Sequence, residues 1–235
     1  HAEQSQKNGE PGYIWLDNAR TRGRMKDGKR DDDLNVAGFN PCVEQQLEDA
    51  ELCCLVETFP AKHESFDDYL ATLKVAYLYG KTVTLVNTHW PETNSIMLKN
   101  RRIGLSQSGV VQAFAKHGRE WCDKSYKHVK QLDKYYSNWL CVPRSVRMTS
   151  IKPSGTVSLL NGSTPGIHFP EDEYYIRRIR FSNTSELLSP LKKAGYKMED
   201  DAYSPNTTVV EFPVKEPHFT KSKRYVSMWE QLEIA

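Results

Sequence analysis

The chain has 235 residues, of which 38% are hydrophobic and 26% are charged, as in an ordinary globular protein. Its 32 basic and 30 acidic residues leave a net charge of +2, which argues against bulk electrostatic binding to nucleic acid or to a membrane surface. No apolar run approaches the ~20 residues of a membrane span, and no signal peptide is visible.

The five cysteines are an odd and unevenly spread set, which predicts a cytoplasmic protein whose thiols stay reduced. The chain begins at His1 and ends in the sequence WEQLEIA, which is typical of an unfinished helix. We therefore expect part of a longer protein.

The first half of the chain predicts mainly helices. The charged, glycine-containing residues 21–35 are expected to form a loop. Ser65 can cap a helix with Asp68 in a capping box, and Gly80 is a typical stop. An apolar stripe supports this helix: Phe66, Tyr69, Leu70, Leu73 and Tyr77. Further along we expect a strand over 82–87, a loop over 88–102 and helices over 103–118 and 120–140.

The second half begins with an irregular stretch, rich in glycine, proline and hydroxyl residues, that runs from residue 144 to residue 170. A strand is expected over 174–181, a helix over 185–199 and a further strand over 207–214. Strands separated by helices predict an α/β fold.

Three of the five cysteines lie within the segment GFNPCVEQQLEDAELCCLVETFP, residues 38–60. Most cysteines of this kind are small, buried and inert, and that is our interpretation of Cys122 and Cys141. The segment has no paired CxxC motif and no suitably spaced histidines, so we expect no metal site. The lack of CxxC also argues against a simple redox protein.

The pentapeptide NPCVE places an amide, a thiol and a carboxylate close together. Pro41 favours extended backbone before it, and in an extended tip Asn40, Cys42 and Glu44 would point the same way. A chain reversal could bring Cys53 near Cys42. Cys54 would then face the opposite side.

The stretch KPSGTVSLLNG predicts a turn that leads into a helix. Backbone N–H groups and hydroxyls at such a position form an anion site, and the glycine permits close approach. The residues concerned are Ser154, Gly155, Thr156, Val157 and Ser158. An ordinary capped turn remains an alternative, and the stretch is not a P-loop. Lys152 could add positive charge, whereas His168 is expected to pack beneath the turn.

These motifs resemble those of ribonucleotide reductases, and NPCVEQQLEDAELCCLVETFP resembles the finger loop of the monomeric, adenosylcobalamin-dependent (class II) ribonucleoside-triphosphate reductases. The resemblance continues through NRRIGLSQSG, IKPSGTVSLLNGSTPGIHFP, YYIRRIRF and VVEFPV, and so covers nearly the whole chain. It implies that residues 1–235 are one partial catalytic domain of the family's ten-stranded α/β barrel. The finger loop would span residues 36–56 and the phosphate-binding turn residues 152–158.

The resemblance also implies residue roles. Cys42 would carry a thiyl radical that abstracts the 3′ hydrogen of the ribose, Glu44 would take the 3′-hydroxyl proton, and Asn40 would hydrogen-bond the substrate hydroxyls. Cys53 would be one of two cysteines that reduce the 2′ position. Adenosylcobalamin would initiate the radical, a thioredoxin-type protein would supply electrons, and ribonucleoside triphosphates would be reduced to deoxyribonucleoside triphosphates.

Other family features have no counterpart here. The second reducing cysteine, the carboxyl-terminal cysteine pair and the binding region for the deoxynucleotide effector are expected outside residues 1–235, so the chain by itself should be inactive. Two alternatives stay open: a ribonucleoside-diphosphate reductase of another class, and a non-catalytic nucleotide-binding module.

Overall fold

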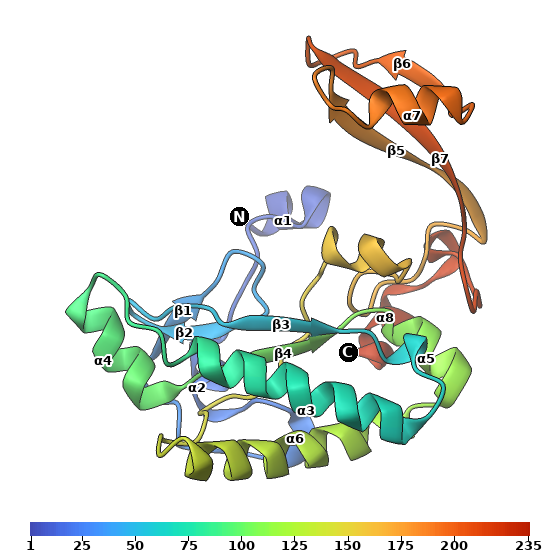
Figure 1. Ribbon diagram of the computed structural model, residues 1–235. Helices are drawn as coiled ribbons and strands as arrows, with labels where there is room; N and C mark the ends of the chain where they lie inside the picture. Colours follow the sequence, from blue (N-terminus) through green and yellow to red (C-terminus); the bar gives the residue numbers. More distant parts are fainter.

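Two parallel strands and two long helices form the centre of the structure, a computed structural model that describes residues 1–235. Strand β3 (Leu55–Thr58) pairs with β4 (Gly104–Gln107) from Leu55 opposite Gly104 to Thr58 opposite Gln107. Residues 147–150 continue this layer on the far side of β4, where Leu105 bridges to Thr149. Helices α3 (Phe66–Val83) and α6 (Glu120–Trp139) lie side by side on one face of these strands (Figure 1).

The core lies between the helices and the strands. Nine buried residues of α3, β4, α6 and their neighbours form it: Tyr69, Leu73, Tyr77, Ile103, Leu105, Val129, Leu132, Tyr136 and Met148. Because the apolar side chains of β3 and β4 point toward α3, their other face is left for the polar residues described below.

The remaining elements surround this centre. Before β3 lie α1 (Ala2–Asn8), α2 (Leu16–Thr21), η1 (Met25–Asp27), β1 (Val36–Phe39) and β2 (Gln46–Glu48). Between β3 and α6 lie η2 (Pro60–Lys62), α4 (Pro91–Asn100) and α5 (Val110–His117). After the 3-10 helix η3 (Val157–Asn161) come β5 (Tyr174–Ser182), α7 (Leu188–Lys193), β6 (Met198–Asp200), β7 (Thr207–Lys215), η4 (Lys223–Tyr225) and α8 (Met228–Ile234). None of the helices is long and apolar enough to cross a lipid bilayer.

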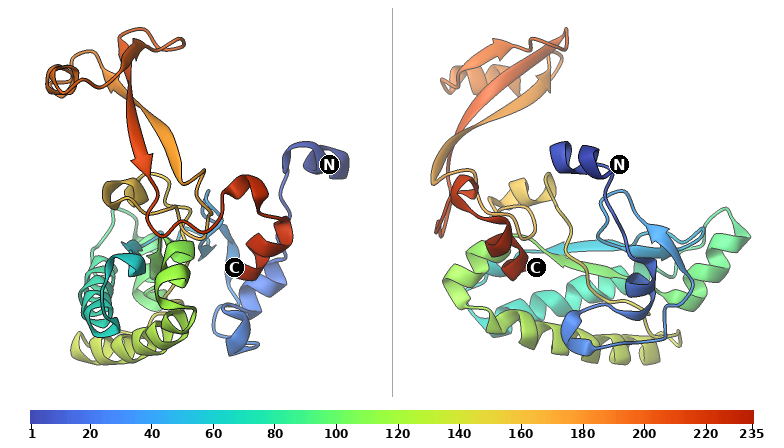
Figure 2. Two further views of the ribbon diagram at one scale, coloured as in Figure 1. Left: turned by 90° about the vertical axis from the view of Figure 1, so that its right-hand side faces the viewer. Right: turned by 180° about the vertical axis from the view of Figure 1, so that it is seen from behind.

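Strands β5, β7 and β6 form an antiparallel sheet in that order, with α7 beside it. We call residues 174–215 the arm, because they project from the rest of the structure in all three views (Figures 1 and 2). The predicted strands over 174–181 and 207–214 are confirmed by β5 and β7. The predicted helix over 185–199 is confirmed only in part, since α7 has six residues and Met198–Asp200 form β6.

The helix prediction over 120–140 is confirmed by α6, whereas the strand prediction over 82–87 is wrong. Helix α3 runs through Gly80 to Val83. Gly80 is the point of closest approach to the strands: a Cβ there would lie 3.1 Å from Ile103 Cγ2 and 3.2 Å from Val56 Cγ2. The glycine therefore serves packing instead of ending the helix.

Two further predictions need correction. The expected loop over 88–102 contains α4, which begins with Pro91 at the first helical position, where its missing N–H costs nothing. The expected helix over 103–118 begins with strand β4 and becomes helical only at Val110. Residues 104–106 are buried on both faces, so β4 lacks the alternation that identifies a strand from sequence.

Candidate active site

Strands β1 and β2 form an antiparallel hairpin whose tip, residues 40–45, carries the NPCVE motif. The tip is a closed turn and not extended, so the expected alternation of its side chains is wrong. Asn40 closes it: its N–H donates to Gln45 O (3.1 Å), its O accepts from Val43 N (2.9 Å), and its Oδ1 accepts from Gln45 N (3.0 Å). Val43 takes a positive φ of 62° as the chain reverses.

The Asn40 side chain joins two parts of the predicted site. Its Nδ2 donates to Cys53 Sγ at 3.7 Å, across thirteen residues of chain. Asn40 and Cys53 are therefore brought together, whereas the reversal predicted from sequence was one that brings Cys53 near Cys42. Cys54 is buried on the other side of the strand, which leaves Cys53 as the adjacent thiol on the hairpin side.

The Cys53 thiol is half-buried, and burial, together with the charge of Glu44 and with the neighbouring thiols of Cys54 and Cys42, raises its pKa to about 11. Lys152 opposes this shift. At neutral pH Cys53 is thus a protonated thiol. The charges of Glu44 and Lys152 therefore act on the Cys53 sulfur in opposite directions.

Glu44 and Cys42 differ in their exposure. Both carboxylate oxygens of Glu44 are shielded from solvent and accept no hydrogen bond within the chain. A buried carboxylate without a donor is unfavourable unless another molecule supplies one. The Cys42 side chain, by contrast, is exposed at the tip of the hairpin.

The strand after Cys53 adds a residue that sequence reasoning missed. Glu57 accepts a hydrogen bond from Ser108 Oγ (2.6 Å), and its second oxygen is buried without a partner. Burial raises the pKa of the Glu57 carboxyl, assisted by Glu44 and opposed by Ser108 and Lys152. Strand periodicity could have identified Glu57 from the sequence, because residues 53 and 57 are four positions apart and side chains at even spacing share one face of a strand.

The predicted phosphate-binding turn is a short loop that leads into a 3-10 helix, η3, and not into an α-helix. Ser158 N and Ser158 Oγ both donate to Ser154 O, at 3.2 and 2.6 Å. The N–H groups of Gly155, Thr156 and Val157 have no acceptor within the chain, and these three residues are exposed. Consecutive free N–H groups of this kind form a nest for anions.

The turn is tied to β4 and to the residue that follows it, and β4 pairs with β3, the strand that carries Glu57. Lys152 N donates to Ser106 Oγ (2.8 Å), and Gly166 N donates to Ser108 Oγ (3.0 Å). Gly166, with φ 47°, passes so close to the Lys152 carbonyl that a Cβ would lie 2.6 Å from its oxygen. His168 is exposed and lies beside Gly155 instead of packing beneath the turn, so that expectation is wrong.

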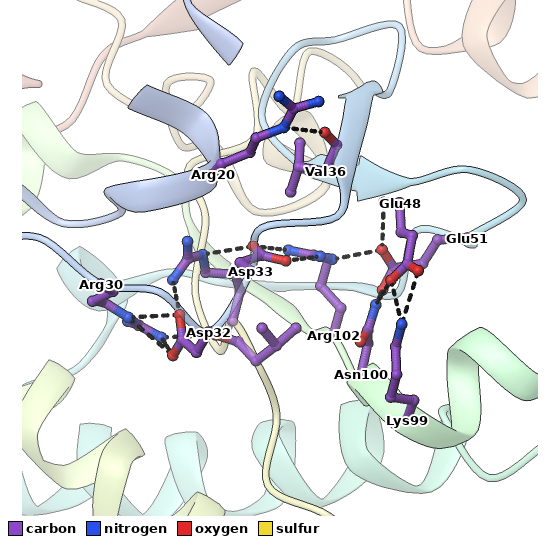
Figure 3. A network of polar contacts seen from close by, with 12 residues as sticks. Arg20, Arg30, Asp32, Asp33, Val36, Glu48, Glu51, Lys99, Asn100 and Arg102 are labelled. Carbon is purple, nitrogen blue, oxygen red and sulfur yellow. Dashed lines mark hydrogen bonds and ion pairs between the residues drawn. The ribbon is translucent and has the colours of Figure 1, made fainter. Parts of the chain in front are cut away.

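A buried arginine anchors both ends of the hairpin (Figure 3). The guanidinium of Arg102 pairs with Asp33 before β1, at 2.7 and 2.8 Å, and with Glu51 after β2, at 3.0 Å. Asn100 donates to Glu51 and Glu48, at 3.1 and 3.0 Å. Burial alone would lower the pKa of Arg102, but the two carboxylates raise it. The hairpin is thus held at its base while its tip stays free to meet a ligand.

Comparison with known structures identifies the fold, although no family model matches the chain. The crystal structure of a B12-dependent (class II) ribonucleotide reductase superposes with a TM-score of 0.91 at 34% identity, over 99% of this chain and 37% of that one. The fold is therefore that of part of a ribonucleotide reductase α/β barrel.

Two curated relatives identify the class of ribonucleotide reductase to which the chain belongs. A probable adenosylcobalamin-dependent ribonucleoside-triphosphate reductase of Dictyostelium discoideum is 52% identical over 97% of this chain and 31% of its own length. The adenosylcobalamin-dependent ribonucleoside-triphosphate reductase of Euglena gracilis is 49% identical over 99% of this chain and 33% of its own length. The chain belongs to this class II family, and it spans about a third of the length of these relatives.

Proposed function

We propose that the protein containing this chain reduces ribonucleoside triphosphates to 2′-deoxyribonucleoside triphosphates with a cysteine thiyl radical. The observation that carries the proposal is the meeting of the amide of Asn40 with the Cys53 thiol, beside the unpartnered carboxylate of Glu44. These are the three kinds of group that ribose reduction requires next to a radical sulfur. The family membership supports the same activity.

Each residue has a distinct role in this proposal. Cys42, exposed at the tip, takes the 3′ hydrogen atom of the ribose and later returns it. Glu44 accepts the proton of the 3′ hydroxyl, and it needs such a donor because its oxygens have none. Asn40 uses one amide hydrogen for Cys53 and keeps the second for a substrate hydroxyl. The free N–H groups at 155–157 hold substrate phosphate.

The net reaction removes the 2′ hydroxyl as water. Two thiols supply two electrons and two protons and become a disulfide. Cys53 is one of them, and its high pKa keeps it protonated and able to donate. The second thiol belongs to a segment outside residues 1–235. So does the cysteine pair that would reduce the active-site disulfide back to two thiols, and a thioredoxin-type protein is the proposed final reductant.

Adenosylcobalamin is the proposed cofactor, as in the names of the relatives. The structure is compatible with this, because the Cys42 thiol is open to a bulky group approaching the tip of the hairpin. When bound, the cofactor supplies the radical that removes the thiol hydrogen of Cys42. No residue of the chain is assigned to hold it.

The same proposal covers the organisation of the chain. Residues 1–235 form one partial catalytic domain, with the finger loop over 36–56 and the phosphate-binding turn over 152–158. A deoxynucleotide effector would bind elsewhere in the longer protein. The five free cysteines favour a reducing compartment such as the cytoplasm.

The test compares two exposed cysteines in the intact protein, Cys42→Ser and Cys141→Ser. Cys141 is free and exposed, so its interpretation as a buried cysteine is wrong; it lies after α6, where its sulfur donates one hydrogen bond, to Asn138 O. Deoxynucleotide formation is measured with adenosylcobalamin and a dithiol reductant. We expect Cys42→Ser to abolish product and Cys141→Ser to leave the rate unchanged, because only Cys42 can carry the radical.

Two outcomes would contradict the proposal. Retention of product formation by Cys42→Ser would favour the alternative of a nucleotide-binding module whose cysteine has no catalytic part. Full activity without adenosylcobalamin, or with ribonucleoside diphosphates alone, would instead favour a reductase of another class.

A further inference from the structure

At the foot of the arm, the start of β5 lies close to the segment that leads to α8 (Figures 1 and 2). Residues of both segments line a cavity of about 840 Å³. It shares Gly155 with the phosphate-binding turn. The other walls come from residues 163–177, Glu216 and residues 223–231. The cavity is therefore continuous with the anion nest but extends beyond the groups that the proposed function uses.

One arginine of β5 lines this cavity while its neighbours do not. Arg178 pairs with Glu199 and Arg180 with Asp201, both on the arm. Arg177 has no carboxylate within ion-pair distance, and its guanidinium donates to Tyr175 Oη at 2.7 Å. The position along β5 produces this division, because the cavity is lined by the first residues of the strand, 174–177, and Arg178 and Arg180 lie further along it. A second cation without an ion pair, Arg224, also lines the cavity.

Two buried hydroxyls also point to a polar ligand. Ser163 and Thr164 line the cavity, are 4% and 3% exposed, and have hydroxyl oxygens without any hydrogen-bond partner. Buried hydroxyls are nearly always paired in a folded protein. Their position between Gly155 and Arg177 leaves two donors for a ligand that reaches both.

Three acidic residues line the same cavity, and two of them have side-chain partners within the chain. Glu171 pairs with Lys223. Glu216 is buried and accepts hydrogen bonds from Gln112 and Tyr175, and burial raises the pKa of its carboxyl, although Arg177 opposes that shift. Asp172 accepts a hydrogen bond only from the backbone N–H of Glu173. Because Arg177 and Arg224 have no ion-pair partner, the cavity offers two free cations to an anion.

We propose that this cavity holds the outer phosphates of a nucleoside triphosphate whose inner phosphate lies on the 154–158 turn, with Arg177 as the principal contact. The inference rests on the proposed function and deepens it. In this inference, contacts in the cavity at the foot of the arm allow the protein to bind triphosphate substrates more tightly than diphosphates. Arg224, Ser163 and Thr164 complete the contacts.

The test measures equilibrium binding of a ribonucleoside triphosphate and of the matching diphosphate to the intact protein. Arg177→Gln is expected to weaken triphosphate binding about tenfold, the effect of one charge-assisted hydrogen bond, and to leave diphosphate binding unchanged. Arg178→Gln is the matched control, because it removes the same charge from the next residue outside the cavity, and it should change neither affinity.

A second variant is expected to gain affinity, a result that misfolding could not produce. Asp172→Asn removes the acid that has no side-chain partner and keeps the shape of the side chain, so it should tighten triphosphate binding about threefold, a modest effect for one partly screened charge. The inference is overturned if Arg177→Gln weakens both nucleotides equally, or if neither variant changes triphosphate binding. Inorganic tripolyphosphate that binds together with the diphosphate, without competition, would also overturn it by revealing a separate site.

These outcomes are separable from those of the proposed function. Product formation by the unaltered protein, with its loss in Cys42→Ser, tests the chemistry without reference to Arg177. If the unaltered protein makes product but the Arg177→Gln variant binds triphosphate as tightly as the unaltered protein does, the proposed function stands and this inference is wrong. If the unaltered protein makes no product but the variants show the expected affinities, this inference stands and the proposed function is wrong.

Discussion

The thiol of Cys53 shows how neighbouring residues set the chemistry of a single group. It is half-buried, lies in contact with Asn40, and has a pKa raised to about 11 by burial first and by Glu44 second. The side-chain amide of Asn40 has two roles, because its Oδ1 accepts a hydrogen bond that closes the turn and its Nδ2 donates to the sulfur. Replacing Asn40 would therefore disturb the fold of the hairpin tip as well as the proposed hydrogen bond to the substrate.

This environment predicts a measurable change at Cys53. Glu44→Gln removes a negative charge that disfavours the thiolate, so the pKa of Cys53 should fall. At about pH 9, below that pKa, the thiolate fraction and the alkylation rate should rise severalfold, because the thiolate is the nucleophile. Mass spectrometry of the peptide that contains Cys53 in the intact protein measures the rate.

Glu120→Gln is the control for this experiment, because Glu120 is exposed and pairs only with Lys124 on α6. It should leave the reactivity of Cys53 unchanged. An equal alkylation rate in Glu44→Gln and the unaltered protein would mean that the two side chains are too far apart to interact.

At the scale of elements, the hairpin depends on a strand and a helix that are distant in sequence. Arg102 stands just before β4, and its partners Asp33 and Glu51 flank β1 and β2. All three side chains are almost completely buried. The local sequence of the hairpin contains no sign of this anchor, since the arginine lies about fifty residues away from Glu51.

Arg102→Leu should lower the free energy of unfolding of the intact protein by ~3–5 kcal/mol, because it leaves the buried carboxylate of Glu51 without a cation, whereas Asp33 keeps its pair with Arg147 at 3.1 Å. Urea denaturation measures the change. The matched control is Arg178→Gln, whose partner Glu199 is exposed and whose loss should cost about 0–1 kcal/mol. Equal effects of the two substitutions would show that the anchor contributes no more than a surface ion pair.

At the scale of the whole molecule, the structure divides into a cored body and an arm with little core of its own. The nine core residues all belong to the body. In the arm only Val209 and Val210 are buried apolar residues, and β5 has no buried residue. The arm nevertheless contributes Arg177 to the cavity at its foot.

Hydrogen exchange of the intact protein should reflect this division. Amides of β5 and β6 should exchange well before those of α3, β4 and α6, since opening the arm exposes few apolar contacts. Peptide-resolved exchange followed by mass spectrometry measures the order. Protection of β5 as strong as that of β4 would indicate that the arm is stabilised by contacts beyond this chain.

The sequence by itself determined the α/β class and the elements with strong periodicity, such as α6, β5 and β7, and it singled out the residues proposed for the finger loop. These features are local: Asn40, Cys42 and Glu44 are close along the chain whatever the fold. The closed turn of the tip is also local, since Asn40 bonds to Val43 and Gln45, but only the structure revealed it. Only the tertiary structure decided that α3 continues past Gly80 and that Arg102 and Arg177 face the hairpin and the cavity, because these arrangements depend on packing between distant segments, which residue propensity and spacing do not encode.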